Sequence, residues 1–249
     1  MRNFFKGILI GIAGICALAL LWLFVFQPEL TRYEAKSLKD AFEQSGLGAS
    51  STGAVLHSPP EIGDSQLLDF TSLQTCHPDI KAWLAIRDTP IDYPVLQSSI
   101  ADPEHYLRRN YTGEYRVAGS LFLQADCTLD GQCLVIYGHN MNDGTMFGTL
   151  PMYTNPVFFR EHSQIVLQTP DGTRVYRVAA VLETDVNRVP FNRANFFSDV
   201  DFLGYVQCIR DEAMISADSV ISTDSQLLVL VTCSYTWANA RYVVVAVRN

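Results

Sequence analysis

The chain begins with a long apolar segment. Residues 8–26 are 19 consecutive uncharged positions, and Arg2 and Lys6 precede them. As an α-helix the segment is roughly 28 Å long, close to the thickness of the hydrocarbon core of a bilayer. Trp22 lies near its far end, where an interfacial anchor is expected. The pattern predicts a single membrane-spanning anchor with a cytoplasmic N-terminus and an extracellular body.

A cleaved signal peptide is the alternative interpretation of this segment. The apolar run is too long for a typical signal-peptide core. No small-x-small cleavage site follows it before Gln27 and Pro28. The sequence therefore favours an anchor that stays attached.

Two short helices are predicted between the anchor and the rest of the chain. The first is indicated by apolar residues near helical spacing, with Gly46 as a plausible end: Leu30, Tyr33, Leu38, Ala41 and Phe42. Residues 46–64 are rich in Gly, Ser and Pro and indicate a loop. Residues 65–76 are predicted to form the second helix. The expected division is an anchor at 1–26, a membrane-proximal helix and linker at 27–64, and one folded domain at 65–249.

From Ile80 onward the pattern changes to short β-rich runs. These runs are AWLAI, YPVLQ, GSLFLQ, CLVIYG, QIVLQT, RVYRVAAVLE, LLVLVTC and RYVVVAV. Residues 170–172 (Pro-Asp-Gly) between two of them are a strong hairpin signal. Many short strands with few helices predict a mostly β fold, a closed or nearly closed antiparallel barrel.

One helix is predicted to interrupt the strands. Ser198, with Asp201 three residues later, resembles a capping box at a helix N-terminus. The apolar residues that then fall on one helical face are Phe202, Tyr205, Val206 and Ile209.

The composition excludes two classes of protein. Hydrophobic residues make up 48% and charged residues 18%, as in an ordinary globular domain rather than a disordered chain. The net charge of −8 argues against nucleic-acid binding, which needs basic patches.

Five of the six cysteines lie outside the predicted anchor, so at least one of them is unpaired or pairs between chains. Cys127 and Cys133 are close enough in sequence to close a short loop. An odd cysteine in an exported body is a weak indication of a functional thiol, because unpaired buried cysteines are often inert.

Cys233 and Arg241 are the first candidate catalytic pair. Cys233 ends one apolar strand, Arg241 begins the next, and seven residues join them. If the two strands form a hairpin, the two residues lie side by side at one rim of the sheet. A guanidinium there favours the nucleophilic thiolate and can donate to a developing oxyanion. The alternative is that Cys233 is a core residue and Arg241 a surface charge.

His139 favours the catalytic interpretation. It follows the buried-looking strand CLVIYG and lies in the polar loop GHNMNDG. A histidine in a loop at the end of a strand is placed for access rather than for packing. The sequence contains no zinc-binding pattern such as CxxC or HExxH, so neither a metal nor another cofactor is predicted.

Two segments resemble the signature regions of class B sortases. They are YGHNMNDGTMF (137–147) and TCSYTWANAR (232–241), and HPDIKAWLAI, IDYPVLQ and AGSLFLQAD resemble further class B segments in the same order. The resemblance covers about residues 65–249. It implies a sortase-type β-barrel of about eight strands, with N-terminal helices and a helix in the connection between the sixth and seventh strands.

The resemblance also implies the function. The protein would be a cysteine transpeptidase that cleaves a C-terminal sorting signal after threonine, forms a thioacyl enzyme and joins the surface protein to a peptidoglycan amine. Cys233 would be the nucleophile, His139 the acid and base, and Arg241 the third catalytic group. The sequence departs from the family at Val231, where class B often has a substrate-contacting serine, and at Ser234, where some members have an acid.

Val231 and Thr232 are the predicted substrate-binding residues, with Tyr205 of the predicted helix as a further candidate. Two other functions stay open at this point. A cysteine peptidase would use the same three residues with water as acceptor, whereas a non-enzymatic surface receptor would not need Cys233.

Ordinary pKa values set an expectation for the rate. With a thiol near ~8.5 and an imidazole near ~6.5, about 3% of the thiol is ionised and about a quarter of the imidazole is protonated at pH 7. Only about 1% of the enzyme would then hold both groups in the reactive state. Turnover is therefore expected to be slow unless ion pairing shifts these values.

Overall fold

The computed structural model describes residues 2–43 and 67–248. Its helical elements precede the strands or lie between them. The α-helices are α1 (Arg2–Leu21), α2 (Gln27–Phe42), α3 (Phe70–Cys76), α4 (Pro156–Glu161) and α5 (Asp199–Glu212), with a π-helical turn η1 (Trp22–Phe26) and two 3₁₀ turns, η2 (His105–Arg108) and η3 (Leu150–Thr154). The predicted linker at 46–64 lies outside the described residues.

In the described part of the chain, nine strands form a single sheet. They are β1 (Ile80–Ala85), β2 (Asp92–Leu96), β3 (Leu121–Leu123), β4 (Cys133–Tyr137), β5 (Gln164–Thr169), β6 (Gly172–Thr184), β7 (Ile215–Ser216), β8 (Leu227–Cys233) and β9 (Arg241–Arg248). The order is β5-β1-β2-β3-β4-β8-β9-β6-β7, and β5 also pairs with β6. That last pairing closes eight strands into a barrel, while the two-residue β7 is added along the edge of β6. The predicted mostly β barrel of about eight strands is confirmed.

Two pairings in the barrel are parallel, so the prediction of an antiparallel barrel is wrong for them. β2 runs parallel to β3, and β4 runs parallel to β8. Long connections precede β3 and β8, and such crossovers return the chain in the same direction. Apolar alternation along a strand carries no information on the direction of its partner, so the sequence pattern alone could not reveal these two pairs.

The local predictions between β5 and α5 are confirmed. Thr169 pairs with Gly172, and the two residues between them form the tight turn of the β5–β6 hairpin. Gly172 has φ 124°, a conformation that favours glycine. At the start of α5 the Ser198 hydroxyl accepts a hydrogen bond from the Asp201 amide at 3.2 Å. The helix lies between β6 and β8, as the resemblance implies, and packs its apolar face on the barrel.

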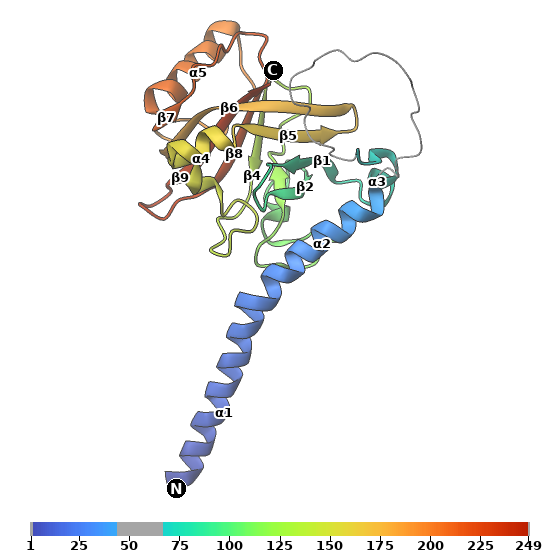
Figure 1. The fold of residues 1–249 in the computed structure, drawn as a ribbon, viewed down its shortest axis with the longest axis vertical. Coiled ribbons are helices and arrows are strands. Elements are labelled where there is room, and N and C mark those ends of the chain that lie inside the picture. The colour runs from blue at the N-terminus through green and yellow to red at the C-terminus, as the bar shows by residue number, and fades with distance from the viewer. Residues whose placement is uncertain (1, 44–66, 249) are drawn as a thin grey trace.

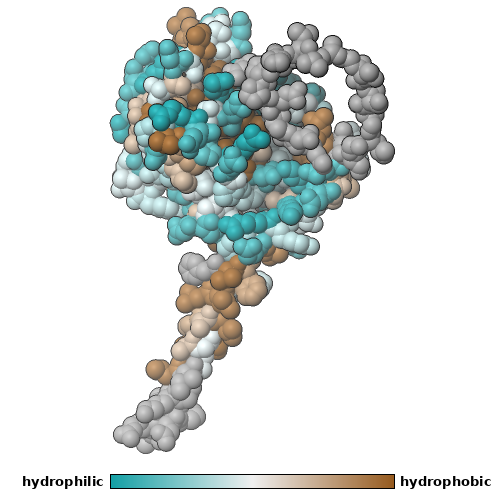
Figure 2. Space-filling view, viewed as in Figure 1, coloured by the Kyte–Doolittle hydropathy of each residue, from teal (hydrophilic) through white to brown (hydrophobic). Residues whose placement is uncertain are grey.

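The N-terminal helix projects away from the barrel as one long rod (Figure 1). Its described apolar side chains, including Leu9, Ile15 and Leu18, are 69–73% exposed, and they form a brown band below the hydrophilic body in Figure 2. Within the described part of the chain, no helix meets the combined requirement of length and apolarity for crossing a membrane. The predicted spanning segment at 8–26 is thus not confirmed.

Helix α2 is bound to the barrel by two ion pairs. The Lys39 ammonium lies 2.6 Å from an Asp92 carboxylate oxygen, and the Arg116 guanidinium lies 2.5 Å from Glu34. Thr31 and Leu38 on the same helix are buried. The predicted helix after the apolar segment is therefore a docked part of the domain. The second predicted helix begins later than expected, because the Asp69 side chain caps it by accepting from the Ser72 amide.

A pair of glycine variants tests how tightly the barrel is packed next to His139. A Cβ at Gly138 would lie 2.4 Å from the Leu121 side chain and 2.8 Å from Phe147, both fully buried. We expect Gly138→Ala to lower the free energy of unfolding by about 1–3 kcal/mol. Gly204 in α5 has no heavy atom within 4 Å of such a Cβ, so Gly204→Ala should raise it by up to about 1 kcal/mol.

Urea unfolding followed by circular dichroism measures both changes. Equal stability of the two variants would contradict the packing described around Gly138.

Candidate active site

The site lies where the parallel strands β4 and β8 end at the same rim of the barrel. Tyr137 and Val231 are paired in the β4–β8 register. Beyond this pair the Gly138 amide donates to the Val231 carbonyl at 3.2 Å, and the Thr232 hydroxyl donates to the Gly138 carbonyl at 2.7 Å. These two bonds keep Gly138 and Thr232 beside each other. The next residue of each segment, His139 after Gly138 and Cys233 after Thr232, is therefore held close to the neighbouring strand.

Cys233 and Arg241 face each other across the β8–β9 hairpin, as predicted. They are the last antiparallel pair of the ladder, next to the loop that joins the two strands. Both side chains are half-buried. One guanidinium nitrogen of Arg241 donates to the Ala240 carbonyl at 2.9 Å. This bond orients the guanidinium and leaves other donors for a ligand.

His139 is held through one of its two ring nitrogens. Its Nε2 lies 2.9 Å from the Leu107 carbonyl oxygen. A carbonyl only accepts, so Nε2 carries a proton and Nδ1 is the atom left to exchange one. Burial lowers the pKa of His139, the nearby charge of Arg108 lowers it further, and the Leu107 carbonyl acts in the opposite direction. The imidazolium fraction at neutral pH is therefore smaller than for a free histidine, which strengthens the expectation of slow turnover.

A groove of about 570 Å³ joins these side chains. Its lining comes from the segment around η2, from β3, from the ends of β4 and β8 with the start of β9, and from the segment between β6 and α5. The lining residues are Pro103, Glu104, Leu107, Phe122, Gln124, Ala125, Tyr137, Gly138, His139, Val186, Asn187, Phe191, Asn192, Val231, Thr232, Cys233, Asn239 and Arg241. The lining is mixed in polarity, and it includes all three predicted catalytic residues.

The predicted substrate-binding residues have different outcomes. Val231 and Thr232 both line the groove, although the Thr232 hydroxyl is already bonded to Gly138. Tyr205 does not line it, so its assignment as a substrate contact is corrected. Residues 202, 205, 206 and 209 share one face of α5, and that face packs into the core, where Tyr205 is only 3% exposed.

Two groups that position the site were missed in the sequence. The Asn140 side chain donates to the Cys233 carbonyl at 2.8 Å and so ties the histidine loop to the nucleophile strand. Asn140 stands next to His139 in the polar loop, which was an available signal. The Leu107 carbonyl lies 32 residues from His139, and a backbone acceptor at that distance has no sequence signature.

Cys127 and Cys133 differ from Cys233 in their surroundings. All six thiols are free, so the short loop between Cys127 and Cys133 is not closed by a disulfide. Both are buried, and burial raises the pKa of the Cys127 thiol to about 11. Thiols in such surroundings are poor nucleophiles.

Among the described residues, no group of three His, Cys, Asp or Glu side chains is placed to hold a metal ion.

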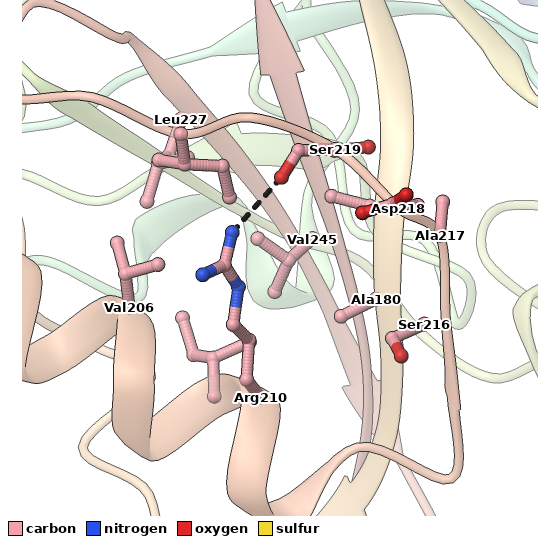
Figure 3. Close-up of a pocket in the computed structure, with 12 residues that line it drawn as sticks. Ala180, Val206, Arg210, Ser216, Ala217, Asp218, Ser219, Leu227 and Val245 are labelled. Carbon is pink, nitrogen blue, oxygen red and sulfur yellow. Dashed lines mark hydrogen bonds between the residues drawn. The ribbon is translucent and has the colours of Figure 1, made fainter.

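A second cavity of about 440 Å³ lies between α5, the barrel and the segment after β7 (Figure 3). Its walls are mostly small or branched apolar side chains such as Ala180, Val206 and Val245. The Arg210 guanidinium reaches across it and donates to the Ser219 carbonyl at 2.9 Å. None of the predicted catalytic residues lines this cavity.

Comparison with known proteins identifies relatives of the chain. The family model described as a sortase domain matches residues 84–249. The sortase B of Listeria monocytogenes is 32% identical over 167 residues, which cover 66% of this chain and 67% of that protein.

Solved structures match in the same way. The Staphylococcus aureus sortase B–substrate complex superimposes with a TM-score of 0.67 and 27% identity, covering 72% of this chain and 84% of that one. A sortase B complexed with triglycine gives a TM-score of 0.66 and 28% identity, covering 72% and 85%.

The surroundings of His139 give a prediction on its titration. Replacing Arg108 by glutamine removes a positive charge that disfavours the imidazolium. We therefore expect the pKa of His139 to rise toward its usual value. Arg109→Gln is the matched control, and it should leave the pKa unchanged. An NMR titration of the imidazole measures both variants and also reports the tautomer. An unchanged pKa in Arg108→Gln, or a neutral form protonated at Nδ1, would contradict the geometry described.

Proposed function

The chain belongs to the sortase family, and from this premise we propose how its own residues carry out the reaction. The protein is a cysteine transpeptidase of the sortase B type that anchors surface proteins. We assign Cys233 as the nucleophile, His139 as the acid and base, and Arg241 as the oxyanion-stabilising group. The observation that carries this assignment is that His139 and the Cys233–Arg241 hairpin, which lie far apart in sequence, line one groove.

The first half of the reaction forms the acyl enzyme. The Cys233 thiolate attacks the carbonyl carbon of a threonine in the sorting signal, and a C–S bond forms. Arg241, paired with Cys233 across the hairpin, donates to the oxygen that becomes negative. When the tetrahedral intermediate collapses, the C–N bond breaks. The leaving amine takes the proton that His139 carries on Nδ1.

The second half regenerates the thiolate. An incoming amine attacks the thioester carbonyl and gives a proton to Nδ1 of His139, which is now neutral. The C–S bond then breaks, and Cys233 leaves as thiolate. Throughout, Nε2 keeps its bond to the Leu107 carbonyl, so the ring does not need to turn between its two tasks.

The relatives guide the choice of substrates. One solved sortase B holds a substrate and another holds triglycine. For this chain we propose a surface protein with a C-terminal sorting signal as acyl donor and an amine of peptidoglycan as acceptor. The apolar Val231, which lines the groove in place of the serine common in class B, would favour an apolar contact with the peptide. Water is the competing acceptor.

We further propose that the protein is held at the cell membrane by the apolar segment at 8–26, with the catalytic domain outside. We propose the predicted division, with an anchor at 1–26, a membrane-proximal helix and linker at 27–64 and a catalytic domain at 65–249, and with α2 docked on that domain. Exposed apolar side chains along α1 support this, because such a surface is stable in lipid but not in water. N-terminal sequencing of membrane-extracted protein tests it, and a mature chain starting near residue 27 would argue against a retained anchor.

The nucleophile assignment predicts a selective loss of activity. Cys233→Ala should abolish cleavage of sorting-signal peptides, because none of the other described thiols opens into the groove. Cys76→Ala and Cys208→Ala are matched controls, since both thiols are free and accessible, and they should keep the activity. The assay uses a library of LPxTG-, NPxTN- and SPxTG-like peptides with triglycine as acceptor and mass spectrometry of the products. Turnover by the Cys233 variant would exclude this nucleophile. Release of acid only, even with triglycine in excess, would indicate a peptidase.

The role of Arg241 predicts a graded response. Lysine keeps the charge but lacks the planar, two-pronged donor geometry of the guanidinium. Arg241→Lys should therefore fall well below wild type in kcat/KM, and Arg241→Ala should lose on the order of 100- to 1000-fold. A thermal melt of each variant controls for folding. If Arg241 is only a surface charge at a strand end, a folded Arg241→Ala enzyme will have nearly normal kcat/KM.

A further inference from the structure

The loop that joins Cys233 to Arg241 is fastened at its start by a carboxylate from another strand. Glu183, near the end of β6, is paired with Tyr242 of β9. Its Oε1 accepts hydrogen bonds from the Ser234 hydroxyl and, at 2.5 Å, from the Thr236 hydroxyl. The Tyr242 hydroxyl of the paired strand helps to lower the pKa of this carboxylate. Two hydroxyl donors from the loop therefore meet on one oxygen of this side chain.

The loop is closed around this carboxylate. The Ser234 amide donates to the Ala240 carbonyl at 2.9 Å, and the Thr236 amide to the Ser234 hydroxyl at 3.3 Å. Ser234 is only 5% exposed. It directly follows Cys233, and Ala240 directly precedes Arg241. Whatever holds Ser234 and Ala240 together thus also sets the spacing between the thiol and the guanidinium.

A second carboxylate, Asp185, lies just beyond the end of β6. The Asn187 amide, and to a smaller extent the Trp237 side chain of the loop, lower the pKa of Asp185. Its Oδ1 also accepts from the Asn187 amide at 2.9 Å, and Asn187 lines the groove. The end of β6 therefore holds the loop at Ser234 and Thr236.

We propose that Glu183 is a positioning residue of the transpeptidase: by binding the hydroxyls of Ser234 and Thr236 it holds the Ser234–Ala240 loop, and so keeps Cys233 and Arg241 in reactive register. The proposal rests on the assignment of those two residues made above. Glu183 does not line the groove, so it acts through the loop and not on the substrate.

The carboxylate is suited to this task over the physiological pH range. Burial raises the pKa of Glu183, but hydrogen bonds from Ser234, Thr236 and Tyr242 oppose it and leave the pKa below its usual value. A carboxyl with a lowered pKa stabilises the folded state above its unfolded pKa, and this contribution is lost as the pH falls through the folded value. Near neutral pH this stabilising contribution of the Glu183 carboxylate is therefore present.

The test compares three substitutions in the full-length protein, using the sorting peptide that the wild type cleaves best and triglycine as acceptor. Glu183→Ala removes the acceptor. Since a small misplacement of catalytic groups can cost on the order of 100-fold, we expect kcat to fall about 10- to 100-fold while KM changes little. Glu183→Gln keeps Oε1 as an acceptor for both hydroxyls and should restore kcat to within about threefold of wild type. Glu161→Ala, an exposed carboxylate on α4, is the control and should behave as wild type.

Three outcomes would overturn the proposal. Normal kcat in a folded Glu183→Ala protein would show that the loop does not need the hydrogen bonds to Glu183. Equal losses of kcat in the Ala and Gln variants would show that the rate depends on the negative charge of residue 183 and not on its acceptance of hydrogen bonds. If Glu183→Ala fails to fold, Thr236→Val removes one donor from the loop, and an unchanged kcat there decides against the role. Wild-type turnover and the inactive Cys233→Ala variant are measured alongside, so failure of this inference stays separate from failure of the transpeptidase assignment.

Discussion

Strand β8 is hydrogen bonded to β4 on one edge and to β9 on the other, and the catalytic geometry depends on this double pairing. The parallel β4–β8 ladder brings the ends of both strands to one rim and places His139 beside the nucleophile strand. The antiparallel β8–β9 ladder places Arg241 opposite Cys233. Because a slip of one residue in either ladder would turn the side chains to the other face of the sheet, the buried apolar residues along β8 protect the register of the site.

The side chains around the rim add orientation to this register. The Leu107 carbonyl fixes the tautomer of His139, Asn140 ties the histidine loop to the Cys233 carbonyl, and Glu183 fastens the loop before Arg241. None of these three groups takes part in the bond changes, but each restricts the position of a residue that does. The same enclosure has an energetic cost, because burial disfavours the imidazolium of His139. The site gains a fixed geometry and gives up part of its reactive protonation state.

The sequence predicted the features that depend on neighbouring residues. The β8–β9 hairpin with Cys233 facing Arg241, the Ser198 cap and the tight turn before Gly172 all have local signals in composition and spacing. The direction of β8 relative to β4 has none, since an apolar strand can pair either way. Tyr205 was misassigned because a tyrosine on an amphipathic helix shows the same pattern whether it packs in the core or faces a ligand. The acceptors provided by Leu107 and Glu183 depend on the folded chain and could not be predicted.

The central claim is that Cys233 carries the acyl group during the reaction. Wild-type protein is mixed with a cleavable sorting peptide without an acceptor amine, quenched in acid, digested and analysed by mass spectrometry. The account predicts an adduct of the N-terminal peptide fragment on Cys233, which disappears when triglycine is added and reappears as a triglycine-linked product. Peptide cleavage with no adduct on any cysteine, or with the adduct on a different cysteine, would contradict it.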